Sequence, residues 1–143
     1  MIIVDSSSID LPGSEIDTIS FDNGALRIHF TKALITKTMT GSIERTSWWQ
    51  TGDLIFTDAE LIDAELIDVL PSGSLICTGG DIIDNFYTFR DMLPIPFEGR
   101  GKIHCLLRFQ NHQQVLRATA QTVHLKLVGV AKYIEHIRPD KQP

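Results

Sequence analysis

Three histidines occupy positions of predicted strands from which a side chain points away from the core, and their ring nitrogens suggest a metal site. They are His29, His104 and His124. Zinc ligands must converge, because each nitrogen lies about 2.0–2.1 Å from the shared ion. We expect His104 and His124 on the first and third strands of one meander, about 9–10 Å apart. Each histidine also has a basic residue two positions away, which would repel a dication. We therefore predict solvated surface histidines, without a bound metal or cofactor.

The same outward positions carry further basic side chains, which would form an anion-binding surface if their strands shared one sheet. The full set is Arg27, His29, Lys102, His104, Arg108, His124 and Lys126. An outer sheet face needs polar residues whatever its function, so the sequence favours a solvated surface. We keep His29, His104, Arg108 and His124 as candidates for contact with a ligand or a partner.

Two adjacent tryptophans, Trp48 and Trp49, are candidate interface residues. Neighbouring residues of a strand point to opposite faces, so one ring should enter the core while the other lies outward. An outward tryptophan can stack on a ligand or be buried against another subunit. We favour subunit contact or local packing, and we expect self-association as a homodimer.

Catalytic motifs are missing from the sequence, which contains no Gly-x-Ser-x-Gly, His-Glu-x-x-His, Cys-x-x-Cys or glycine-rich phosphate loop. Cys105 occupies an inward position where burial raises the thiol pKa, whereas Cys77 is expected to be the more accessible thiol. Acidic residues recur every five positions from Asp53 to Asp68. That spacing does not converge on one cation. The interpretation therefore leans against an enzyme.

Composition limits the classes of partner. The chain has 143 residues, the size of one domain, and a formal net charge of −5. Its basic residues are scattered, whereas nucleic-acid binders concentrate them, so we expect no nucleic-acid partner. The N-terminus lacks a basic segment followed by an apolar one, and no window of about 20 apolar residues occurs, so we expect no secretion signal and no membrane partner. With only two cysteines, a reducing cytoplasmic location is expected.

Alternation of apolar and polar residues predicts mostly antiparallel β structure. Asp22-Asn23-Gly24 predicts a hairpin turn, and strict alternation follows along 26–31. The C-terminal half repeats the pattern, and its predicted strands are 102–109, 114–119, 122–128 and 131–137. Leu93–Phe97, with two prolines, is predicted as a rigid crossover. We expect one domain over residues 1–139 and a frayed tail over 140–143.

One stretch is ambiguous. Residues 59–70 contain two copies of Ala-Glu-Leu-Ile-Asp, which fit two strands joined by a bulge or one short helix. About eight or nine short strands with frequent turns favour a two-sheet sandwich or a flattened barrel.

A resemblance supports this fold class. The run Leu93-Pro94-Ile95-Pro96, then Gly99, the alternating 102–109 strand, Gly129 and Tyr133-Ile134-Glu135 resembles the C-terminal half of small uncharacterised bacterial all-β proteins. The resemblance covers about a third of the chain. It implies an all-β fold and brings no activity with it.

The sequence thus predicts a single-domain β-sandwich or flattened barrel that acts as a non-catalytic binding or self-association module of a soluble bacterial-type protein. The competing function is small-molecule binding or catalysis in a pocket built from several strands, which linear motifs do not reveal. Peripheral membrane docking would require acids that converge at loop tips.

Overall fold

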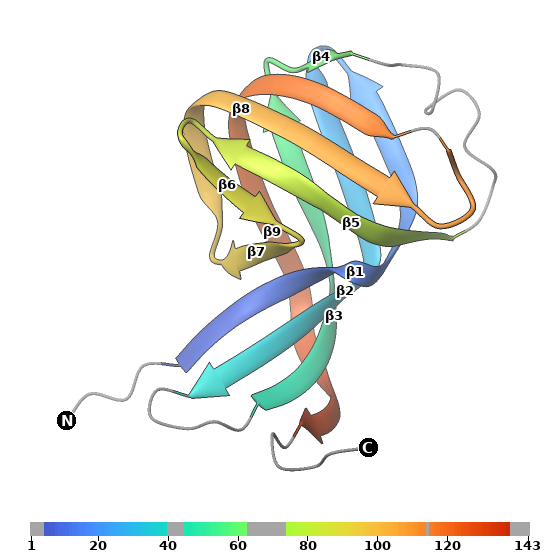
Figure 1. Ribbon diagram of the computed structural model, residues 1–143, viewed down its shortest axis with the longest axis vertical. Helices are drawn as coiled ribbons and strands as arrows, with labels where there is room; N and C mark the ends of the chain where they lie inside the picture. Colours follow the sequence, from blue (N-terminus) through green and yellow to red (C-terminus); the bar gives the residue numbers. More distant parts are fainter. Residues whose placement is uncertain (1–4, 40–44, 63–73, 114, 138–143) are drawn as a thin grey trace.

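The computed structural model describes residues 5–39, 45–62, 74–113 and 115–137, which form nine strands (Figure 1). They are β1 (Asp5–Asp22), β2 (Ala25–Met39), β3 (Arg45–Thr57), β4 (Glu60–Leu61), β5 (Leu75–Asp84), β6 (Tyr87–Arg90), β7 (Met92–Ile95), β8 (Glu98–Phe109) and β9 (Leu116–Ile137). Within these described ranges, no helix has the length and apolar character needed to cross a membrane.

The strands form one antiparallel sheet that closes on itself. Its order is β6-β5-β8-β9-β3-β2-β1-β7, and a further pairing joins β5 to β1 through Ile76 with Glu15 and Leu75 with Ile16. Six strands, β5, β8, β9, β3, β2 and β1, therefore follow one another around a ring. The predicted all-β antiparallel fold, a sandwich or flattened barrel in a single domain, is confirmed.

The core lies inside this ring, because one side of each strand is apolar. Leu26, Ile28 and Phe30 are fully buried on β2, as their alternation predicts. The inward residues of β8, Ile103 to Phe109 at every second position, are buried as well. The hairpin at Asn23-Gly24 is also present, with both residues at positive φ.

Four strands are longer than the ring and continue beyond it at the lower end of Figure 1. We call this part the extension: residues 5–10 of β1, 33–39 of β2, 45–50 of β3 and 130–137 of β9. Register shifts interrupt β1, β2, β3 and β9 where they leave the ring. A bulge bends a strand and increases its twist, which lets each strand change direction there. Buried Ser14 stabilises one bulge by donating to the Asp10 carbonyl oxygen at 2.6 Å and accepting from Leu34 N at 3.0 Å.

The predicted C-terminal meander is wrong. Residues 116–137 form one continuous strand, β9, in place of three separate strands. Ala120 and Gln121 have no turn-forming preference, and Ala120 pairs with Ile103 of β8 within the ladder. Gly129, at a φ of 76°, lies in a register shift and does not end the strand. His104 and His124 therefore lie on adjacent strands, β8 and β9.

The proline-rich crossover needs a correction too. Met92–Ile95 form β7, which pairs with β1 through Leu93 with Ile9 and Pro94 with Ser8. Pro94 is tolerated because β7 ends the sheet order and needs a partner on one side only. In the ambiguous 59–70 stretch, Glu60–Leu61 is a short strand against β9. Residues 63–70 and the predicted tail, 140–143, lie outside the described residues.

Candidate functional site

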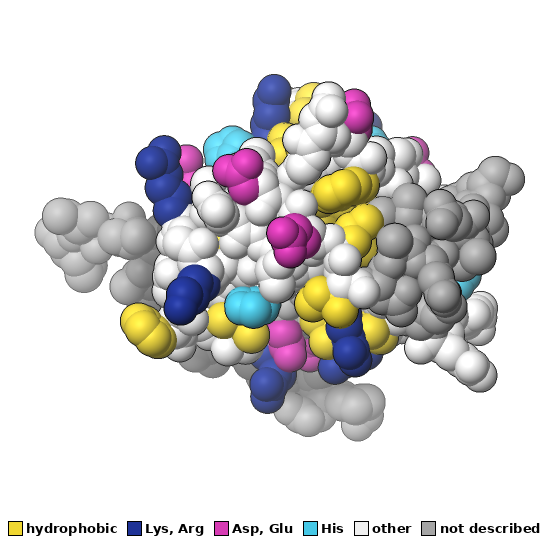
Figure 2. All heavy atoms as spheres, turned by 90° about the horizontal axis from the view of Figure 1, so that it is seen from above, with side chains coloured by type: hydrophobic (Ala, Val, Ile, Leu, Met, Phe, Trp, Pro, Cys, Tyr) yellow, Lys and Arg dark blue, Asp and Glu magenta, His cyan; other side chains and the backbone are white. Residues whose placement is uncertain are grey.

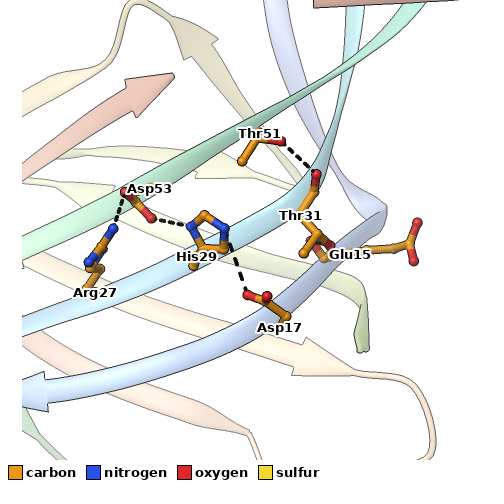
Figure 3. Close-up of polar contacts among 7 residues, drawn as sticks. All are labelled: Glu15, Asp17, Arg27, His29, Thr31, Thr51 and Asp53. Atoms are coloured by element: carbon orange, nitrogen blue, oxygen red, sulfur yellow. Dashed lines mark hydrogen bonds and ion pairs between the residues drawn. The ribbon is translucent and has the colours of Figure 1, made fainter. Parts of the chain in front are cut away.

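Two side chains of β2 meet one carboxylate of β3 on the outer surface of the ring (Figure 3). Asp53 lies between inward-facing Gly52 and Leu54, so it points outward, yet only 5% of its surface is exposed. Its Oδ2 accepts a 2.8 Å hydrogen bond from Nη2 of Arg27, and its Oδ1 lies 2.6 Å from Nδ1 of His29. His29 and Asp53 are direct cross-strand partners. We call Arg27, His29 and Asp53 the Asp53 cluster.

The cluster holds Asp53 in its charged form. Burial raises the pKa of a carboxyl, because it disfavours the charge. Hydrogen bonds from Arg27 and His29, and the attraction of both side chains for the carboxylate, oppose burial and outweigh it. The pKa of Asp53 is therefore lowered below its ordinary value.

The other ring nitrogen of His29 faces a second acid, since Nε2 lies 4.0 Å from Oδ1 of Asp17 (Figure 3). An Asp–His pair orients the general base in hydrolases, but the base there also contacts a nucleophile. Within the described residues, no hydroxyl or thiol is hydrogen-bonded to His29. The arrangement neutralises a buried charge and joins β2 to β3.

Two threonines extend these polar contacts to the base of the extension (Figure 3). Thr51 Oγ1 donates to the Thr31 carbonyl oxygen at 3.1 Å, and Thr31 Oγ1 donates to the Glu15 carbonyl oxygen at 3.3 Å. Both carbonyls lie at register shifts, where the regular ladder is interrupted. The threonines therefore tie β1, β2 and β3 together at the bulges.

The lowered pKa of Asp53 predicts a loss of stability in acid. The stability that the charged Asp53 carboxylate contributes to the folded protein is fully present above pH 3.8, the ordinary pKa of an aspartate. It is lost as the pH falls through the lower pKa of the folded state. Asp53→Asn should cost about 1–3 kcal/mol at neutral pH, because Arg27 and His29 lose a charged acceptor. Urea denaturation at several pH values should show that the difference in the free energy of unfolding between wild type and Asp53→Asn becomes smaller as the pH falls.

Exposed Asp17 provides the control. Asp17→Asn should reduce stability by less than about 1 kcal/mol, because its contact with His29 is long and solvated. A cost for Asp53→Asn that stays constant down to the acid limit would contradict the assigned charge state.

The other candidate histidines and Arg108 do not join this cluster. His124 is exposed on β9, with Nδ1 3.9 Å from Oε1 of Glu98 on β8. Arg108 is exposed on β8 opposite Gly79 of β5. The basic residues of β8 are separated from those of β2 by β9 and β3. Figure 2 shows basic side chains spread around one face with acidic side chains between them, so no large area of one sign forms there.

Both tryptophans lie in the extension and both are half-buried. Trp48 packs against the core and meets Tyr133 edge-on, with ring centroids 5.3 Å apart. Trp49 lies near two ammonium groups, with Lys132 Nζ 4.7 Å and Lys32 Nζ 5.3 Å from its ring centroid. Trp48 thus packs against the core, as expected for one of the two rings. Trp49 is not fully exposed, because lysines of β9 and β2 partly cover its ring.

A hollow of about 570 Å³ lies over β8 and β9, and it contains His104. The ionisable residues that line it are Asp58, Glu60, Arg100, Lys102 and His104. We call it the charged hollow. The sequence did not predict that these acids and bases line one hollow, because strand pairing brings them together from distant parts of the chain. The alternating basic residues at 100, 102 and 104 were the only available signal.

The expectation for Cys77 is wrong, because both free thiols are buried. Desolvation raises the pKa of Cys77 to about 11. Burial also raises the pKa of Cys105. Both thiols are therefore protonated near neutral pH and poor nucleophiles.

In the part of the chain that the structure describes, no three His, Cys, Asp or Glu side chains are grouped as metal ligands. Comparison with known proteins adds no assignment. No protein-family model, no curated protein and no solved structure matches this chain.

Proposed function

We propose that this protein is a non-catalytic module that self-associates as a homodimer through the outer edge of β9. Pairing of β9 with β8 ends at His124, followed by one bond of 3.0 Å from Leu125 N to the Phe97 carbonyl oxygen. From Lys126 to Ile137, β9 pairs with β3 on one side. No strand among the described residues pairs with its other side. This unpaired edge is the observation that carries the proposal.

Apolar side chains accompany the unpaired edge. Val128, Val130, Tyr133 and Ile134 are 50%, 84%, 55% and 44% exposed. An exposed strand edge with apolar residues can accept another strand, whose main chain supplies the missing hydrogen bonds. Pairing with a second chain would satisfy the backbone of β9 and cover these residues.

Charge favours a second copy of this chain as that partner. Lys132 and Glu135 lie on the same face of the extension, because they pair with Trp49 and Ser47 of β3. In an antiparallel pair centred between residues 133 and 134, Lys132 of each copy would lie opposite Glu135 of the other. The edge is thus complementary to itself, as an isologous dimer interface must be.

The proposal includes a cytoplasmic location, which suits two free cysteines. Small-molecule binding remains the second candidate function, and the charged hollow is the observation that favours it.

Sedimentation velocity across micromolar concentrations tests the dimer. We expect a reversible monomer–dimer equilibrium. Val130→Lys should weaken it about tenfold or more, because in this register Val130 lies opposite Ile137 of the other copy, and the change would place a charge against that apolar side chain. Phe86→Lys is the matched control, since Phe86 is fully exposed in the β5–β6 turn. A wild-type protein that stays monomeric throughout, or equal effects of both variants, would overturn the proposal.

A further inference from the structure

The charged hollow has two walls of opposite sign. Arg100, Lys102 and His104 line it from β8, whereas Glu60 of β4 and Asp58, just after β3, line it from the other side. Strand β9 runs between the walls, because Thr122 pairs with Arg100 and Thr119 pairs with both Glu60 and His104. Two strand spacings separate the walls, about 10 Å.

The four charged side chains and His104 have no ion pair with any described residue, and all five are exposed. The Asp53 cluster contrasts with them, because its opposite charges lie on adjacent strands and neutralise one another. In the charged hollow, the intervening strand keeps the acids away from the bases. A bound molecule with separated charges could bridge them.

The basic wall has a defined backbone. Between Arg100 and Ile103, β8 bulges relative to β9. The amide of Asn85 closes this bulge, donating to the Arg100 carbonyl oxygen at 2.7 Å and accepting from Lys102 N at 3.0 Å. Asn85 N also donates to the Lys102 carbonyl oxygen at 2.9 Å. The backbone that carries both cations is therefore fixed before any ligand arrives.

We propose that the charged hollow binds a zwitterionic small molecule of the size of a short peptide. The anionic end would lie against Arg100, Lys102 and His104, and the cationic end against Asp58 and Glu60. A volume of about 570 Å³ is ample for such a ligand. An extended tripeptide spans about 10 Å, which matches the separation of the walls. Its amino and carboxyl ends are both charged at neutral pH.

Triglycine is the probe, and nitrogen-15 NMR titration of the whole chain is the measurement. Triglycine should cause saturable shifts at Arg100, Lys102, Thr119 and Thr122. Acetylated triglycine lacks the positive end and triglycine amide lacks the negative end, so each should bind about tenfold more weakly. Retained affinity of the acetylated form would show a simple anion site and overturn the zwitterion proposal.

Single substitutions test which charged end of triglycine each wall of the hollow binds. Arg100→Gln should weaken triglycine binding about fivefold without altering the affinity for triglycine amide. Glu60→Gln should weaken triglycine similarly and leave the acetylated form unaffected. Arg108→Gln, an exposed change on the same strand outside the hollow, should have no effect. Absence of saturable binding, or equal effects of the variants at 100 and 108, would reject the site.

Discussion

Replacing Gly80 with alanine should destabilise the folded protein by about 3 kcal/mol, the largest effect expected from adding one methyl group. A β-carbon at Gly80 would clash with the carbonyl oxygen of Leu106 and would lie 2.7 Å from Cδ2 of Leu107. The carbonyl cannot retreat easily, because on its other side β8 pairs with β9 through Arg117 and Leu116. The new atom would therefore push β5 away from β8 and open the ring.

The backbone of Gly80 is also fixed by Asp91. Gly80 N donates to Oδ1 of Asp91 at 2.9 Å, and Asp91 N donates to the Gly80 carbonyl oxygen at 2.7 Å. A displaced β5 would strain these bonds as well as the ladder. The measurement is urea denaturation at equal protein concentration, because dimerisation would change the apparent stability.

Gly129→Ala is the matched control. Nothing lies within 4 Å of a β-carbon built there, but φ is 76°. The substitution should cost only about 1 kcal/mol, from the left-handed backbone. Equal costs at Gly80 and Gly129 would show that close approach of β8 is not what requires glycine at position 80.

Reversing one charge on the β9 edge should weaken the dimer about 100-fold, because Lys132→Glu would place like charges opposite each other at two symmetric contacts, each worth about tenfold. Glu135→Lys should weaken it similarly. The double variant carrying both reversals should recover most of the wild-type affinity. Sedimentation velocity at matched concentrations gives the dissociation constants.

Mixing the two single variants provides the sharpest version of this test. One chain then presents two acids and the other two bases, so native mass spectrometry should show the mixed dimer in excess over either homodimer. Lys132 also lies near the ring of Trp49, and Lys132→Glu removes that contact whatever the pairing. Preference for the mixed dimer is therefore the result that separates intermolecular pairing from local destabilisation. A dimer unaffected by either reversal would exclude the register centred between residues 133 and 134.

Local sequence patterns predicted which residues form strands better than they predicted where each strand ends and which strands pair. Alternation along 26–31 identified the buried face of β2, because a strand exposes its residues alternately to core and solvent. The same pattern at Thr122 to Leu127 identified the inward residues of β9 but could not show where the strand began or ended. The predicted break between the strands 114–119 and 122–128 falls at Ala120 and Gln121, where pairing of β9 with β8 and β3 keeps the backbone extended.

The candidate sites were predicted less completely, because they depend on contacts between distant residues. Strand alternation predicts that His29 points outward, but in the sequence Asp53 stands out only through a five-residue spacing of acids. Their contact needs the register of β2 against β3. Cys77 was expected to be accessible, yet it lies in a strand whose inward positions close the ring. No local pattern relates Arg100 to Glu60, because they face each other only through their pairing with β9 on either side.

Local residue patterns were sufficient to predict antiparallel strands, the sides of them that face the core, and the Asn23-Gly24 turn that joins the first two. These properties follow from backbone preferences and from the burial of nearby apolar residues. Contacts between distant strands are what bring β5 to β1 and close the ring, bury Asp53 on its outer surface, and leave β9 beyond β8 with one edge unpaired among the described residues. Closure and register depend on hydrogen bonds between residues far apart in the chain, and no local pattern specifies them.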